Sequence, residues 1–88
     1  MANRITRTDL EQKVRTLNSW MLDDPEPHPD TPLSFHLDEN AAGIGLNRVH
    51  MSGDGITRIL YPDTKRTTYE NLTALLLGVE LTIENNHK

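Results

Sequence analysis

The sequence predicts one α+β domain of order α-β-β-β-α, in which a three-stranded antiparallel meander carries two helices on one face. Three patterns support this fold class. Apolar residues recur at helical spacing near both ends of the chain, the middle alternates between apolar and polar residues, and glycine-rich turns separate the alternating segments. Packing both helices against one face of the sheet is the simplest two-layer solution. Because the chain has 88 residues, we expect a single domain over 1–88.

The first helix is predicted over residues 7–21. Thr6 occupies the N-cap position, and Asp9 supplies an acidic side chain three positions later. Thr8 with Glu11 offers an alternative start two residues further on. One apolar stripe then recurs at intervals of four, three and four residues: Leu10, Val14, Leu17 and Met21. We expect this stripe to face the core.

Residues 23–32 are predicted to form a stiff, extended, acidic connector. They contain four of the five prolines, which remove backbone donors and fix φ. Acidic residues are interleaved with the prolines: Asp23, Asp24, Glu26 and Asp30. We expect the segment to be a spacer between the first helix and the sheet. The same composition also suits docking on a partner as polyproline II.

Three strands are predicted over residues 33–38, 44–51 and 56–61. The first alternates cleanly, which directs three apolar side chains to the core: Leu33, Phe35 and Leu37. Residues 39–43 are expected to form a turn, and residues 52–55 a glycine-rich hairpin turn. The third strand is rich in β-branched and aromatic residues.

The second helix is predicted over residues 65–81. Either Thr64 or Thr67 caps it, and Thr67 with Glu70 matches a capping box. Its apolar positions again follow helical spacing: Tyr69, Leu72, Leu75, Leu76 and Val79. Gly78 either ends this helix or is tolerated inside it.

The composition excludes several classes of protein. The chain has no cysteine, which rules out disulfides, thiolate zinc sites and cysteine nucleophiles. Thirteen acidic residues against nine basic ones give a net charge of −4, which argues against a general duplex-DNA binder. No apolar stretch is long enough to span a membrane, and no signal peptide is evident. We therefore expect a cytoplasmic protein without a membrane partner.

A thin core and two-sided apolar strands predict self-association. A chain of this length buries only about 60–65% of its unfolded surface. The strands predicted at 44–51 and 56–61 carry apolar residues on both faces, and monomers rarely expose large apolar patches. We therefore expect a homo-oligomer. Trp20 either covers the edge of the core beside the connector or belongs to an interface.

The sequence shows no arrangement of residues typical of catalysis or metal binding. The histidines lack metal-ligand spacing: His28, His36, His50 and His87. The serines lack a nucleophile motif, and the carboxylate pairs lie in segments that should be solvated. We therefore predict a non-enzymatic protein without a metal, a cofactor or catalytic residues.

The start of the second helix is the best candidate for a binding site. Lys65 and Arg66 follow Thr64 at the positive end of that helix, where cations are unfavourable unless an anion is bound. We expect Arg48 and Arg58 to approach from neighbouring strands, and Tyr61 to stack on a base. The predicted site for a small anionic ligand thus comprises Thr64, Lys65, Arg66, Arg48, Arg58 and Tyr61. Alternatively, Lys65 and Arg66 only pair with nearby acids, such as Asp63 or Glu70.

Two motifs lie on either side of the predicted meander: Ile5-Thr6-Arg7-x-Asp9-Leu10-Glu11 and Lys65-Arg66-x-x-Tyr69-x-x-Leu72. In these motifs, and in its glycine-rich meander, the chain resembles a group of small phage and prophage proteins of unknown function. The resemblance implies a phage accessory gene product. It assigns no catalytic residue.

Two functions are expected. The first is a non-enzymatic phage protein that counters host defence by sequestering a small anionic, nucleotide-type immune signal. The second is an acidic inhibitor that binds a host nucleic-acid-handling or defence protein through its acidic connector.

Overall fold

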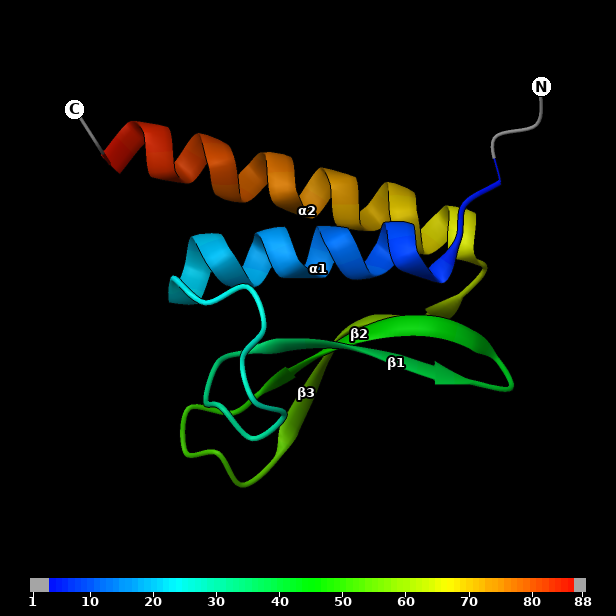
Figure 1. Cartoon of the computed structure of the whole chain (residues 1–88), viewed down its shortest axis with the longest axis horizontal. Helices are drawn as coiled ribbons and strands as arrows, with labels where there is room; N and C mark the ends of the chain where they lie inside the picture. The colour runs from blue at the N-terminus through cyan, green and yellow to red at the C-terminus, as the bar shows by residue number, and fades with distance from the viewer. Residues whose placement is uncertain (1–3, 87–88) are drawn as a thin grey trace.

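The computed structural model describes residues 4–86 and confirms the predicted fold class. The elements are α1 (Arg7–Leu22), β1 (Phe35–Asn40), β2 (Gly43–Val49), β3 (Ile56–Asp63) and α2 (Lys65–Asn86). The strands form one antiparallel sheet in the order β1-β2-β3. Both helices lie on the same side of this sheet and run side by side in the same direction (Figure 1).

Helix α1 begins at Arg7, where its capping residues indicate, and ends at Leu22, one residue beyond the predicted range. The side chain of Thr6 accepts a hydrogen bond from the backbone N–H of Asp9, and the Asp9 carboxylate accepts one from the N–H of Thr6. This reciprocal pair satisfies donors that a helix start otherwise leaves free. At the other end, Asp23 adopts a left-handed conformation and donates its N–H to the Ser19 carbonyl.

The strand boundaries differ from those predicted. β1 begins at Phe35 instead of residue 33, because Leu33 has a φ of 65° that no strand accommodates. β1 also extends to Asn40, so the first turn is shorter than the predicted 39–43. β2 ends at Val49 because the chain turns from His50, whose N–H and carbonyl bond within the 50–55 loop.

The third strand and the second helix both run further than predicted. β3 continues to Asp63 through Pro62. An edge strand tolerates proline, which has no backbone N–H, because one side of the strand pairs with no neighbour. α2 continues past Gly78 and residue 81 to Asn86. A methyl group at Gly78 would meet no atom within 4 Å, so this glycine marks neither a turn nor a close packing contact.

The core lies between the two helices and the sheet. The buried apolar side chains that form one cluster are Leu10, Val14, Leu17, Phe35, Ile44, Leu46, Leu72 and Leu76. Leu37 and Leu60 pack against this cluster from the sheet and are only partly buried. Met21, predicted for the same stripe as Leu17, is 41% exposed, because it lies at the end of α1 beyond the sheet contact.

Buried polar side chains fix each helix to the sheet. Asn18 of α1 donates Nδ2–H to the Phe35 carbonyl over 2.9 Å and accepts the Phe35 N–H over 2.8 Å. Thr68 of α2 donates its hydroxyl to the Ile44 carbonyl over 2.6 Å. Because a buried backbone group without a partner costs about 1–3 kcal/mol, these bonds define where each helix sits.

The connector is folded back instead of extended. Pro27 is buried against the domain, and the side chain of Glu26 forms an ion pair with Arg15 of α1 over 3.3 Å. The N–H of Thr31 donates to the His28 carbonyl, which turns the chain before β1. The predicted spacer is therefore part of the packed domain.

Gly45 allows the backbone of β3 to lie very close to the backbone of β2. The pairing of β2 with β3 shifts register on both sides of Leu46, as in a β-bulge. A Cβ at Gly45 would lie 2.4 Å from the Leu60 carbonyl oxygen and 2.9 Å from the Pro62 nitrogen. A side chain at this position would push β3 away from β2.

We predict that Gly45→Ala lowers the free energy of unfolding by about 1–3 kcal/mol, the usual range for overpacking. Gly78→Ala is the matched control and should raise it by about 0.5–1 kcal/mol, because alanine favours the interior of an exposed helix. Urea unfolding of both variants measures the two effects. An unchanged free energy of unfolding for Gly45→Ala would contradict the close approach of β3 to β2 at this position.

Candidate functional site

The face of the sheet that turns away from the helices carries a cation, an aromatic ring and a carboxylate in contact. The guanidinium carbon of Arg58 lies 5.3 Å from the centre of the Tyr61 ring. Arg58 Nη2 also lies 3.8 Å from Asp38 Oδ2. Tyr61 is 76% exposed, so most of its surface is free to contact a ligand.

Strand alternation and the bulge explain this arrangement. Leu37, Leu46 and Leu60 point at the core, so Asp38 and Tyr61, next to them in sequence, point away from it. Arg58 pairs with Asn47 and lies on the same outer face. Gly45, which pairs with Asp38, has no side chain to stand between Asp38 and β3.

The chain passes directly from this outer face to the start of α2. Thr64 caps the helix, because its Oγ1 accepts the N–H of Thr67 over 3.2 Å. Its own N–H donates to Asp63 Oδ1 over 2.7 Å. Lys65 and Arg66 follow in the first turn, and both are exposed. Arg58, Tyr61 and Thr64–Arg66 thus lie along one continuous segment, which we call the corner site.

Arg48 lies elsewhere. It pairs with Phe35 and Thr57 at one end of β2, whereas Ile44 at the other end pairs with Asp63 beside α2. Its guanidinium lies 4.6 Å from the Phe35 ring centre, and its Nε donates to the Leu33 carbonyl over 3.1 Å. The expected approach of Arg48 to the other predicted residues is therefore wrong, because this side chain stabilises the start of β1.

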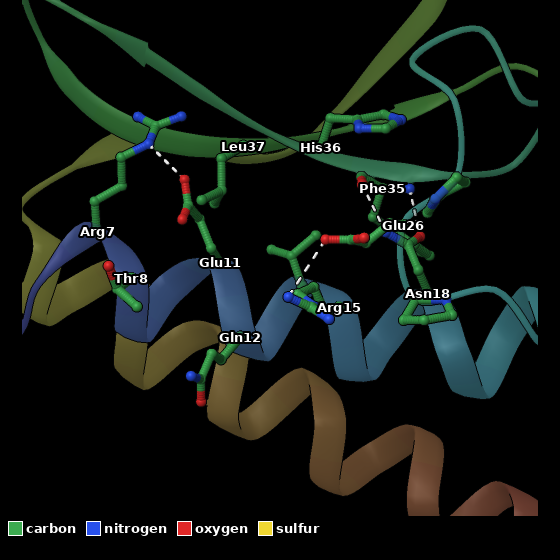
Figure 2. Close-up of a pocket in the computed structure, with 13 residues that line it drawn as sticks. Arg7, Thr8, Glu11, Gln12, Arg15, Asn18, Glu26, Phe35, His36 and Leu37 are labelled. Carbon is green, nitrogen blue, oxygen red and sulfur yellow. Dashed lines mark hydrogen bonds and ion pairs between the residues drawn. The ribbon is translucent and has the colours of Figure 1, made fainter.

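A groove of about 460 Å³ lies between α1, the connector and β1, and it was not expected from the sequence (Figure 2). Arg7 bonds Glu11 and also Glu39, whereas Arg15 pairs with Glu26. The hydrogen bond from Arg7 to Glu11, aided by the charge of Glu39, raises the pKa of Arg7 above its ordinary value. Acids and bases balance here, so the groove has no net preference for an anion.

Long-range packing forms this groove, and the sequence carries little sign of it. Phe35 and Leu37 form one wall because they point from β1 toward α1 (Figure 2). Pro25 and Pro27 form another wall because the connector folds back. A polar Asn18 one position after the apolar Leu17 is the one local hint, since a buried amide needs partners.

His36 lies at the end of the same groove, where the connector meets β1. Its Nε2 lies 2.7 Å from the hydroxyl of the buried Ser34. Burial lowers the pKa of His36 below its ordinary value, because a charged imidazolium loses hydration there. The neutral ring is therefore the form that the fold favours.

Residues 4–86 contain no group of three or more His, Asp or Glu side chains arranged to hold a metal ion. In the same part of the chain, no helix is both long and apolar enough to cross a membrane.

Comparison of the chain with protein-family models, curated proteins and solved structures finds no match.

We predict that lowering the pH destabilises the fold partly through His36. The unfolded chain binds a proton at His36 at a higher pH than the folded chain does, so protonation favours unfolding as the pH drops below about 6.5. His36→Gln removes this contribution. Urea unfolding at pH 7.5 and 5.5 should show that the free energy of unfolding decreases less for the variant than for the wild type between these two pH values. Equal losses would contradict the role given to His36.

Proposed function

We propose that this protein is a non-enzymatic binding protein that sequesters a small anionic, nucleotide-type ligand at the corner site. The observation that carries this proposal is the contact of Arg58 with the exposed ring of Tyr61, on the sheet face that no helix covers. An exposed aromatic ring held by a cation provides a stacking surface for a base, with about 1–3 kcal/mol per stacked base.

Asp38 adds a polar contact beside this stacking surface. Its carboxylate lies against Arg58 and is partly exposed. Carboxylate oxygens accept hydrogen bonds from the exocyclic amino groups of bases. The pair with Arg58 is solvated and worth about 0–1 kcal/mol, so a ligand can replace it at little cost.

The start of α2 suits the anionic part of the same ligand. Two residues, Pro62 and Asp63, lie between Tyr61 and Thr64, so the three steps along the strand span roughly 10 Å. Beyond it, Lys65 and Arg66 add positive charge to the positive end of the helix dipole. A ligand with a base at one end and a phosphate at the other therefore fits the length of the corner site.

The resemblance to small phage and prophage proteins supplies a biological context. In that context we propose that the ligand is a nucleotide-type signal of host defence, which binding removes from its receptor. Sequestration needs no catalytic group, only an affinity that exceeds that of the receptor.

The direct test is native mass spectrometry of the protein purified from defence-activated host cells. The proposal predicts a bound mass in the nucleotide range, which is released on unfolding. A protein that remains free of ligand after incubation with a panel of mono- and cyclic dinucleotides would overturn it.

Substitutions at the corner site should identify the residues involved. We predict that Tyr61→Ala, or Lys65→Ala with Arg66→Ala, weakens binding of the identified nucleotide at least about tenfold, the effect of losing roughly 1.4 kcal/mol. Tyr61→Phe keeps the ring and should keep the affinity. Arg15→Ala removes one cation from the groove of Figure 2 and should change little. If isothermal titration calorimetry instead shows that Arg15→Ala loses affinity and the corner-site variants do not, the binding site lies in that groove.

A second candidate function is binding of a basic host protein, and the connector favours it. Its acidic side chains are exposed: Asp23, Asp24, Glu26 and Asp30. They are also held in place, because Glu26 pairs with Arg15 and donates its N–H to Asp24 Oδ1 over 3.0 Å. A fixed row of carboxylates is a surface that steers a basic partner.

For this second function we predict a salt-sensitive complex with a host protein. Replacing Asp23, Asp24 and Asp30 with asparagine should slow association and flatten the salt dependence, because each removes a charge without removing a cap or turn acceptor. Glu70→Gln on the exposed side of α2 is the control. Co-purification that survives the triple substitution unchanged at low and high salt would contradict this function.

A further inference from the structure

Large apolar side chains are exposed where the two helices end. Trp20 and Met21 of α1 are 40% and 41% exposed, and Leu77 and Leu81 of α2 are 56% and 52% exposed. We call these four residues the helix-end patch. They lie toward the C-terminal ends of the two helices, whereas the corner site lies on β3 and at the start of α2.

The lengths of the helices explain why this patch is uncovered. α1 has 16 residues and α2 has 22, and the helices start at the same end of the molecule (Figure 1). At 1.5 Å per residue, α2 therefore extends roughly 9 Å beyond the end of α1. Leu77 and Leu81 are one turn apart, so both lie on one side of this part of α2.

A groove of about 490 Å³ runs between the helices beside the patch. Trp20, Leu76 and Leu77 line it together with the ring of Tyr69. Its polar lining includes Lys13 of α1 and Glu80 of α2, and the Lys13 ammonium lies 4.6 Å from the Tyr69 ring centre. The same surface therefore carries exposed apolar side chains, a recess lined in part by apolar residues, and charges of both signs, to which Asp9 of α1 also contributes.

We propose that a second copy of this chain covers the helix-end patch, with the end of α2 in each copy packed against α1 of the other. A twofold dimer places each surface against itself, so the exposed apolar side chains of each copy fill the recess of the other. Lys13 of each copy then faces Glu80 of the other.

The charges of the two helices favour this pairing over other arrangements of two copies. From Gln12 to Leu22 the charged residues of α1 are basic, Lys13 and Arg15. From Thr67 to Asn86 the charged residues of α2 are acidic: Glu70, Glu80 and Glu84. Contact of α2 with α2 would bring like charges together, whereas contact of α2 with α1 brings opposite charges together.

The exposed edge of β3 is a less suitable interface. It contains Pro62, which has no N–H to donate, and the irregular register on either side of Leu46 distorts the strand. Both features are common ways in which proteins prevent pairing of edge strands. Dimerisation through the helices also leaves the corner site open to its ligand.

Light scattering coupled to size exclusion tests the dimer. The wild type should elute with twice the mass of the chain at micromolar concentration, and Leu77→Gln with Leu81→Gln should give a monomer with an unchanged circular dichroism spectrum. Ile56→Gln removes a side chain that is 61% exposed on β3, and it should leave the dimer intact. A monomeric wild type, or a dimer that survives the double substitution, would overturn the proposal.

A charge exchange tests the arrangement of the helices. Lys13→Glu and Glu80→Lys should each weaken the dimer, because each homodimer then contains two contacts between like charges. In a mixture of the two variants, the heterodimer has two contacts between opposite charges and should form in preference to either homodimer. Mixed variants that show no such preference would contradict the contact of α1 with α2 across the interface.

Discussion

The amide of Asn18 bonds Phe35 much as a neighbouring strand would, by donating to its carbonyl and accepting its N–H. Phe35 opens β1, the edge strand over which α1 packs, and Asn18 is 2% exposed. Loss of this amide would leave two backbone groups without partners at the edge of a thin core, at a cost of about 1–3 kcal/mol each. The position of α1 over β1, and with it the Phe35 wall of the groove in Figure 2, depends on this pair of bonds.

With the hydroxyl of Thr68 bound to the Ile44 carbonyl, the same constraint holds both helices on one face of the sheet. The opposite face is left without a helix over it, and at β3 it carries Arg58 and Tyr61 in contact. The helical layer also exposes apolar side chains, because α2 is longer than α1 and extends beyond its end. A domain this small thus presents two separate surfaces, one suited to a ligand and one suited to a second copy. Their separation allows binding and self-association to occur together.

Local signals in the sequence predicted the element order, the capped start of α1 and most of the core stripe. These features depend on residues a few positions apart, and a capping pair or an alternating strand is visible in a short window. The errors came from contacts between distant residues. Arg48 was expected near Lys65, but its place is set by Phe35 and Leu33 on another strand. The folded connector and the groove beside it follow from a buried Pro27, and no local pattern distinguishes a buried proline from one in a spacer.

The proposed ligand binds at the corner site and not in the groove between α1 and β1. Nuclear magnetic resonance of the labelled protein during titration with the nucleotide panel tests it residue by residue. Binding at the corner site should change the amide chemical shifts along Arg58–Arg66 and at Asp38, while the amide shifts of Arg15 and Asn18 stay unchanged. Changes confined to Arg15, Asn18 and the connector, or no changes with any nucleotide, would contradict it.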